Sequence, residues 1–172
     1  MINDLWDIAA IRTIADQRKW ILHATETIDS TNTALLLRSS TEAIHRHWAI
    51  TKLQLKGKGR RGKVWKTAFS HALLMSFGWT FNRPLHHVVK CISLVVGLSV
   101  IRALESFTPE LRLKWPNDIL LRGKKLAGIL IETAEYTESS TTLVIGLGLN
   151  WYTPSQEELP ESIGLDLSLI HI

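Results

Sequence analysis

Short apolar runs separated by tight turns constrain the fold of this chain more than any other feature. Four such runs occupy the second half of the sequence, at residues 111–115, 119–121, 126–133 and 143–149. Turn signals, among them Pro116-Asn117-Asp118 and Arg122-Gly123, separate neighbouring runs. Apolar runs bounded in this way are typical of β-strands. Strands joined by short turns favour antiparallel pairing over a doubly wound parallel sheet.

The first half of the sequence mixes both kinds of element. Residues 21–28 predict a strand, and alternating patterns predict two more, at residues 49–55 and 72–81. Helical spacing predicts a helix over residues 4–20 with Asp4 as its N-cap, and a second helix over 32–38 opened by Asp29 and Ser30. Residues 85–107 form a long apolar segment rich in small residues, which predicts one buried helix. We therefore expect an α+β fold, in which helices back a mixed, largely antiparallel sheet.

Length and composition predict a single domain outside the membrane. A chain of 172 residues with 45% hydrophobic content suits one core, which we assign to residues 1–172. The longest apolar run, residues 92–101, is too short to span a bilayer, and the acidic N-terminus lacks the basic region of a secretory signal. Cys91 is the only cysteine, which agrees with a reducing compartment. We expect a cytoplasmic protein.

The charges of the chain are unevenly distributed. No Asp or Glu occurs between Ala43 and Leu104, and this segment carries eleven cations: Arg46, Lys52, Lys56, Lys58, Arg60, Arg61, Lys63, Lys66, Arg83, Lys90 and Arg102. A surface built from such a segment has a positive field, so its natural partner is an anion. A solvated basic surface and a non-catalytic nucleic-acid-binding module are the alternatives.

The most informative stretch is the glycine-rich loop from Gln54 to Trp65. Its glycines meet both the G-x-G-x-x-G and the G-x-x-x-x-G-K spacings. The dinucleotide fingerprint also needs a following helix and an acid about 20 residues later, and a P-loop needs Ser or Thr where Val64 stands. Neither nucleotide fold fits. A mobile loop with three glycines and five cations instead predicts closure around an anionic ligand.

Four motifs in order resemble the biotin protein ligases, which are relatives of the lipoate ligases. They are Asp29-Ser30-Thr31-Asn32, the loop from Gln54 to Trp65, Lys114-Trp115-Pro116-Asn117-Asp118 followed by Lys125-Leu126-Ala127-Gly128-Ile129, and Ile145-Gly146-Leu147-Gly148-Leu149-Asn150. The resemblance implies a catalytic domain like that of the class II aminoacyl-tRNA synthetases, with biotin and ATP side by side on the sheet. It also implies that biotin and MgATP form biotinyl-5'-adenylate, and that a lysine of a carboxylase carrier domain then accepts the biotinyl group.

The resemblance also implies roles for individual residues. It gives the catalytic work to Lys125, Arg60 and Arg61, and strand alternation points the neighbouring Lys124 away. Binding of biotin and nucleotide falls to Ser30, Thr31, Asn32, Gln54, Gly57, Lys58, Gly59, Lys63, Trp65, Asn117, Asp118, Gly128, Gly146, Gly148 and Asn150. We expect no structural metal, because His86 and His87 have no third ligand at suitable spacing.

Both ends of the chain differ from the pattern of the biotin protein ligases. Only 28 residues precede Asp29, which predicts no winged-helix domain and no nucleic-acid partner. The chain also ends soon after Asn150, so we expect a C-terminally truncated catalytic domain without a small β-domain. Dimerisation through a sheet edge is implied by resemblance only. A lipoate or octanoate ligase or transferase, or a non-catalytic biotin- or anion-binding remnant, is the alternative function.

Overall fold

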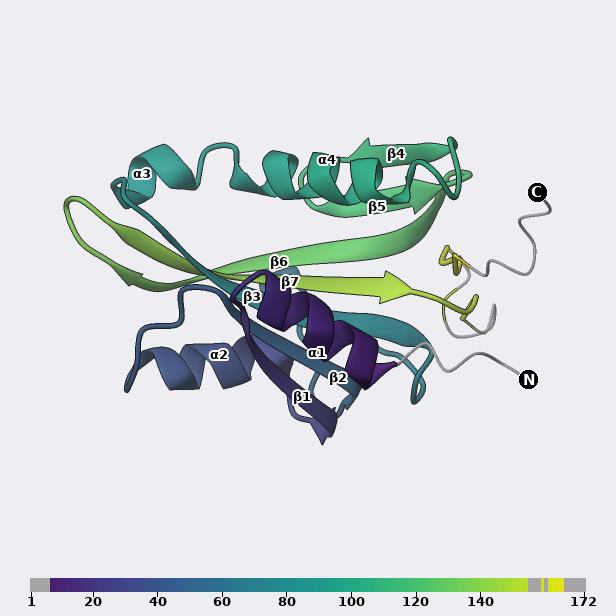
Figure 1. Ribbon diagram of the computed structural model, residues 1–172. Helices are drawn as coiled ribbons and strands as arrows, with labels where there is room; N and C mark the ends of the chain where they lie inside the picture. Colours follow the sequence, from purple (N-terminus) through teal and green to yellow (C-terminus); the bar gives the residue numbers. More distant parts are fainter. Residues whose placement is uncertain (1–6, 155–158, 160, 166–172) are drawn as a thin grey trace.

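Seven strands form one twisted sheet at the centre of the molecule (Figure 1). The computed structural model describes residues 7–154, 159 and 161–165. The strand order is β1-β2-β3-β7-β6-β5-β4. In chain order the strands are β1 (Ile21–Ile28), β2 (His47–Gln54), β3 (Ala72–Phe81), β4 (Leu111–Lys114), β5 (Asp118–Leu121), β6 (Lys124–Tyr136) and β7 (Thr141–Asn150).

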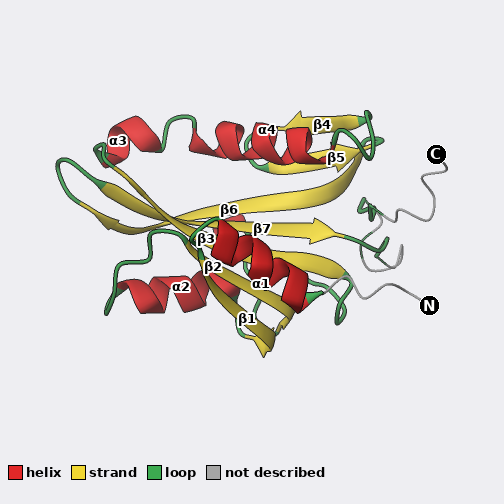
Figure 2. Cartoon of the chain, viewed as in Figure 1, coloured by secondary structure: helices red, strands yellow, loops and turns green. Residues whose placement is uncertain are grey.

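The pairing of the strands confirms the predicted fold class. β1 and β2 are parallel, and every other neighbouring pair is antiparallel. The parallel pair arises because helix α2 (Thr31–Ser39) lies between its two strands in the sequence and returns the chain to the same end of the sheet (Figure 2). The tight turns at residues 115–117 and 122–123 make β4, β5 and β6 antiparallel neighbours, as their sequences predict.

Helices cover both faces of the sheet. Side chains alternate along a strand, so Val144 and the odd-numbered Leu147 of β7 point to opposite faces. Val144 belongs to a small core with Leu35 of α2. Leu147 belongs to a larger core, against which Val96 and Val100 of α4 (Ile92–Leu104) pack. The face on which α2 lies also carries the even-numbered positions of β7, which include two glycines.

The first helix begins later than predicted. α1 spans Ile8–Gln17, and the carboxylate of Asp7 accepts the Ala10 N–H at 2.9 Å. Asp7 therefore caps the helix in place of the predicted Asp4, which lies outside the described residues. The second helix is confirmed, because Ser30 is its N-cap and accepts the Thr33 N–H at 3.4 Å.

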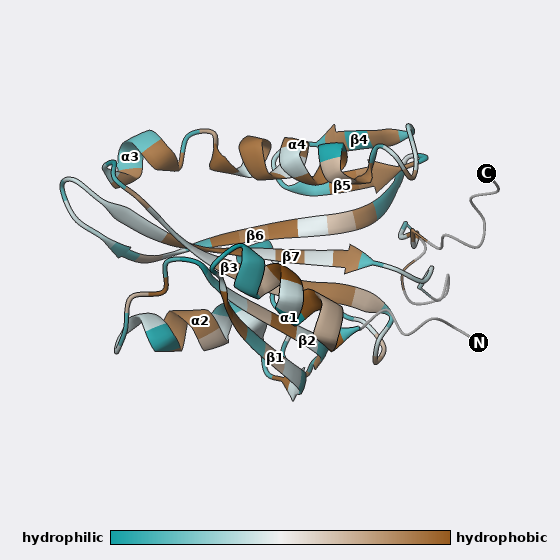
Figure 3. Cartoon of the chain, in the orientation of Figure 1, coloured by the Kyte–Doolittle hydropathy of each residue, from teal (hydrophilic) through white to brown (hydrophobic). Residues whose placement is uncertain are grey.

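The prediction of one buried helix over residues 85–107 is wrong. The segment forms α3 (Leu85–Val88) and α4, and Cys91 between them has non-helical angles of φ −127° and ψ −2°. Only one stripe of α4 packs on the sheet, although hydrophobic residues occupy much of the helix (Figure 3). Val95 and Leu98 are 54% and 55% exposed. Within the described ranges, no helix combines the length and the apolar content that crossing a bilayer requires.

Two histidines pack together beneath α2. From their surroundings we predict that the folded protein becomes less stable at low pH. His23 Nε2 lies 3.2 Å from Nδ1 of His47, which is buried. Burial lowers the pKa of both imidazoles below the ordinary 6.5, and Arg38 lowers that of His23 further. Below pH 6.5 the unfolded chain therefore binds protons that the folded chain does not, so the free energy of unfolding decreases with falling pH.

We expect the thermal midpoint to fall as the pH decreases from about 6.5 towards 5, and a His47→Asn variant to show a shallower decrease. Differential scanning fluorimetry across this range measures both slopes. His86→Asn, at an exposed histidine, is the matched control and keeps the slope of the unchanged protein. Identical slopes for His47→Asn and the unchanged protein would rule out this histidine pair as the source.

Candidate functional site

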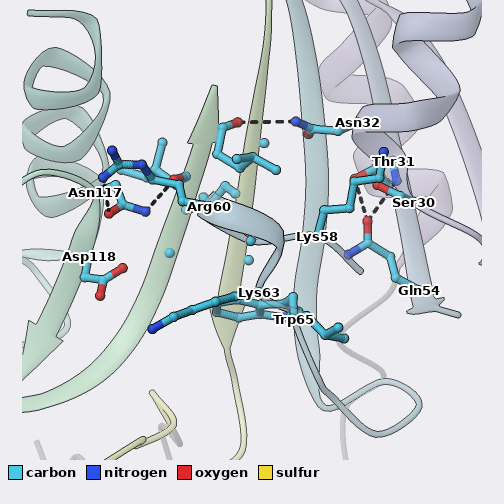
Figure 4. A pocket seen from close by; sticks show the side chains of 18 of the residues that line it. Ser30, Thr31, Asn32, Gln54, Lys58, Arg60, Lys63, Trp65, Asn117 and Asp118 are labelled. Carbon is cyan, nitrogen blue, oxygen red and sulfur yellow. Dashed lines mark hydrogen bonds between the residues drawn. The ribbon is translucent and has the colours of Figure 1, made fainter. Parts of the chain in front are cut away.

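A cavity of about 390 Å³ lies on the face of the sheet that α2 partly covers. This volume is in the usual range for small-molecule sites. Strands β6 and β7 form its floor. Its sides are formed by the start of α2, the loop after β2 and the turn between β4 and β5. Figure 4 shows two groups of side chains that face each other: Ser30, Thr31, Asn32 and Gln54 on one side, and Arg60, Asn117 and Asp118 on the other.

The first group forms a neutral polar wall. The Thr31 backbone N–H donates to Gln54 Oε1 at 2.8 Å, and the Thr31 hydroxyl oxygen lies 3.0 Å from the same atom. This orients the amide of Gln54, because only its oxygen can accept from a backbone N–H. The three residues that open α2 are almost fully buried, with exposed fractions of 2% for Ser30, 3% for Thr31 and 4% for Asn32. The wall is thus ordered by bonds within the protein.

Two residues behind this wall were not predicted from the sequence. Ser76 Oγ lies 2.7 Å from Thr31 Oγ1 and 2.6 Å from Asn32 Oδ1, and Asn32 Nδ2 donates to Glu132 Oε2 at 2.7 Å. Gly146 is required here, since a Cβ at that position would lie 2.1 Å from Asn32 Oδ1. A polar residue on the buried side of an alternating strand is the signal that marks Ser76.

The glycine-rich loop folds into a hairpin that covers part of the cavity. Lys58 and Val64 form an antiparallel bridge, and the Trp65 N–H donates to the Gly57 carbonyl at 2.9 Å. A Cβ at Gly57 would lie 2.5 Å from the carbonyl oxygen of Trp65, so this close pairing excludes a side chain there. At the tip, Gly62 has φ +76°, an angle that glycine adopts without strain.

Trp65 lies over the two glycines of the cavity floor. A Cβ on Gly128 would come within 2.8 Å of its ring, and one on Gly148 within 2.6 Å. Its indole N–H is buried and has no acceptor among the described residues. A buried donor without an acceptor costs free energy, and an acceptor on a bound ligand would recover it.

The opposite side of the cavity is strongly basic. Lys125 Nζ lies 2.8 Å from Asp118 Oδ1 and 5.5 Å from the centre of the Trp65 ring, and Arg60 donates to Asn117 Oδ1 at 3.3 Å. Among the residues that the structure describes, the lining carries one carboxylate and five cations: Asp118, Lys58, Arg60, Arg61, Lys63 and Lys125. This excess of cations over carboxylates in one cavity favours an anionic ligand.

A bulge in β6 brings Lys125 to this cavity. Residues three apart on a regular strand point to opposite faces, yet Lys125 and Gly128 both line the cavity. The register between β5 and β6 shifts between Ile119 and Leu120, so that Leu120 pairs with Lys125 and Ile119 with Ala127. The extra residue, Leu126, is fully buried in the core on the other face.

Most of the predicted site residues meet in this one cavity. Gly57 and Asn150 are not among its lining: Gly57 lines a neighbouring groove under the hairpin, and Asn150 is buried. The Asn150 amide donates to the carbonyls of Lys125 and Ile163, at 3.4 and 3.2 Å. Trp115, which is 75% exposed at the cavity rim, is a lining residue that sequence reasoning did not single out.

Comparisons with known proteins agree with these motifs. The ligase/repressor BirA of Escherichia coli (strain K12) is 36% identical over 132 residues, which make up 76% of this chain and 40% of that protein. The biotin–[acetyl-CoA-carboxylase] ligase of Mycobacterium tuberculosis is 35% identical over 144 residues, 79% of this chain and 51% of the relative. The chain thus spans about half of these relatives' length or less.

A solved structure has the same fold. The biotin protein ligase from Aquifex aeolicus, in complex with biotin and ATP, matches with a TM-score of 0.64 and 29% identity, over 83% of this chain and 58% of that one. The family model described as the biotin/lipoate A/B protein ligase family matches residues 24–150, a range that contains all four motifs. This chain therefore belongs to the biotin/lipoate A/B protein ligase family.

Proposed function

We propose that this chain is the catalytic domain of a biotin protein ligase, which forms biotinyl-5'-adenylate from biotin and ATP. In the first step a biotin carboxylate oxygen bonds to the α-phosphorus and pyrophosphate leaves. In the second, a lysine amine of an acceptor protein bonds to the biotinyl carbonyl, loses a proton and releases AMP. This proposal rests on one observation: a neutral polar wall and a cationic wall line the same cavity.

The neutral wall suits the ureido ring of biotin. This ring is uncharged and carries N–H donors next to a carbonyl acceptor, so it needs matched partners in an otherwise dry pocket. The Thr31 hydroxyl and the Gln54 amide supply an acceptor and a donor side by side. The relatives and the solved structure support the assignment, because their names specify biotin.

The cationic wall suits the reacting groups. A carboxylate and a triphosphate repel each other, and their repulsion must be offset where they meet. Lys125, on β6, and Arg60, on the hairpin, both line the cavity. Groups held in place before the reaction stabilise charge as it develops on the α-phosphate, without reorganisation. We assign this role to Lys125 first, because Asp118 and the Trp65 ring hold its ammonium group inside the cavity.

We propose that Mg²⁺ enters with ATP as part of the substrate. Mg²⁺ at such sites is held by substrate phosphates and one or two carboxylates. Asp118 supplies one carboxylate to the lining. In the part of the chain that the structure describes, no cluster of three or more His, Cys, Asp or Glu side chains has the arrangement of a metal site.

The partners and the location follow from this chemistry. We propose a carboxylase carrier domain as the acceptor, since the Mycobacterium relative is named for an acetyl-CoA carboxylase, and we propose the cytoplasm as the location. A homodimer through a sheet edge stays a prediction, for which β1 and β4 are the edge strands. Sedimentation velocity tests it.

Calorimetric titration with biotin, alone and with MgATP present, tests the proposed function. We expect submicromolar binding of biotin that tightens with nucleotide, and weaker competition by lipoate and octanoate. Tighter binding of lipoate than of biotin would instead assign the chain to the lipoate branch of its family. Absence of binding by folded protein would contradict the proposal.

A further inference from the structure

A chain of hydrogen bonds leads from the neutral wall of the cavity to a carboxylate on β6. It joins Thr31 Oγ1 to Ser76 Oγ at 2.7 Å, Ser76 Oγ to Asn32 Oδ1 at 2.6 Å, and Asn32 Nδ2 to Glu132 Oε2 at 2.7 Å. Ser76 has no exposed surface. Water is therefore excluded from the centre of this chain, and each group in it must be satisfied by its neighbours.

Glu132 determines which way the Asn32 amide points. Asn32 Nδ2 lies near the Glu132 carboxylate and 3.3 Å from the Leu130 carbonyl. An ionised carboxylate and a carbonyl only accept, so the NH₂ group of Asn32 must face β6. The amide oxygen then faces Ser76. The reversed amide would place its oxygen against a carboxylate, and this contact is repulsive because both groups only accept.

The orientation of Asn32 sets the direction of the hydroxyl protons. An amide oxygen only accepts, so the single hydroxyl proton of Ser76 goes to Asn32. Ser76 can then only accept from Thr31. The Thr31 proton goes either to Ser76 or to Gln54 Oε1, which lies 3.0 Å away. In both cases the protein takes the proton of Thr31 and leaves lone pairs on its oxygen for a ligand.

The wall consequently has a fixed hydrogen-bonding polarity. Thr31 Oγ1 is an acceptor, and Gln54 keeps its NH₂ group as a donor because its oxygen is held by the Thr31 backbone N–H at 2.8 Å. An acceptor beside a donor matches the N–H and C=O edge of a cyclic urea. An acyl group without an N–H leaves the acceptor unpaired, which costs binding free energy.

We propose that Glu132 is a positioning residue for ureido recognition: its carboxylate fixes the direction of this chain and makes Thr31 an acceptor. This inference rests on the proposed function. Glu132 bonds to Asn32 and is not part of the cavity lining that contains Lys125 and Asp118; it lines the neighbouring groove under the hairpin. Replacing Glu132 is therefore expected to weaken the binding of biotin and to leave the binding of ATP nearly unchanged.

Steady-state pyrophosphate exchange with a Glu132→Met variant tests the proposal. Methionine has a similar volume to glutamate but is a poor hydrogen-bond acceptor. We therefore expect the KM for biotin to rise about tenfold, and the Kd for desthiobiotin, which keeps the ureido ring, to rise by the same factor. The kcat at saturating biotin and the Kd for ATP alone should change less than about twofold. Glu132→Gln, whose amide oxygen still accepts from Asn32, should keep most of the affinity.

Two further variants separate this role from general damage. Ser76→Ala removes one oxygen from the middle of the chain, so it should reproduce the selective rise in KM even if Glu132→Met folds poorly. Glu135→Met, at an exposed position of the same strand, is the matched control. The proposal would be overturned if the KM for biotin were unchanged in Glu132→Met. It would also be overturned if Glu132→Met and Ser76→Ala both lost ATP affinity and thermal midpoint in parallel with biotin affinity. Failure of the unchanged protein to bind biotin would instead refute the proposed function itself.

Discussion

Replacing Lys125 with methionine is expected to lower the rate of biotin-dependent pyrophosphate exchange by about 10²–10³-fold, the usual cost of losing one preorganised group that stabilises developing charge. The ammonium group of Lys125 is held 2.8 Å from Asp118 and 5.5 Å from the centre of the Trp65 ring. It therefore needs no reorganisation when the carboxylate of biotin approaches the α-phosphate. Biotin affinity in the absence of nucleotide should change far less, because the neutral wall does not involve this residue.

The matched control for this experiment is the adjacent residue. Lys124→Met removes the same charge from an exposed position on the other side of β6, and pyrophosphate exchange should continue at close to the original rate. Quenched-flow measurement of adenylate formation, with MgATP and biotin saturating, compares the two variants directly. Equal losses in both would show that net positive charge near the cavity, and not the position of one ammonium group, accelerates the reaction.

Replacing Gly148 with alanine is expected to destabilise the protein by about 1–3 kcal/mol, the range for forcing extra atoms into a packed site. The new Cβ would lie 2.6 Å from the Trp65 ring, closer than real Cβ contacts occur. A rigid indole yields only by moving as a whole, and the backbone of Trp65 is tied to Gly57 by a 2.9 Å hydrogen bond. Urea denaturation followed by circular dichroism measures the free energy of unfolding.

A double-mutant cycle isolates the cause. In a Trp65→Ala background the clash disappears, and alanine is then expected to be neutral or stabilising at Gly148, because glycine in a strand costs about 0.5–1 kcal/mol relative to alanine. The coupling between the two positions should thus be at least as large as the cost of Gly148→Ala taken alone. An equal cost of Gly148→Ala in both backgrounds would show that the backbone, and not the indole, requires this glycine.

The strands were the most predictable part of the fold. Alternation and turn residues located all seven strands to within a few residues, because these signals act between close neighbours in the chain. The helix over residues 85–107 was mispredicted for the opposite reason. Its apolar residues would suit a buried helix, but whether a helix is buried depends on what packs on its outer side, and Val95 and Leu98 are more than half exposed.

The site could be predicted as a set of residues but not as an arrangement. Local motifs identified Thr31, Gln54, Asp118 and Lys125, and strand pairing brings them to one cavity. No local signal indicated that the Asn150 side chain would donate to two backbone carbonyls away from the cavity lining. Its partners lie 25 and 13 residues away in the sequence, and only the folded chain brings them together.

The fold class, the order of the motifs and the chemical character of the two walls could all be predicted from residue type and periodicity, because these are properties of the chain. Three further features arose only on folding. A bulge at Leu126 turns Lys125 towards Gly128. Trp65 lies over two glycines, and Glu132 contacts Asn32, which is 100 residues away in the sequence. Each depends on contacts between distant strands, whose register and packing are selected by the whole sheet and not by any local pattern.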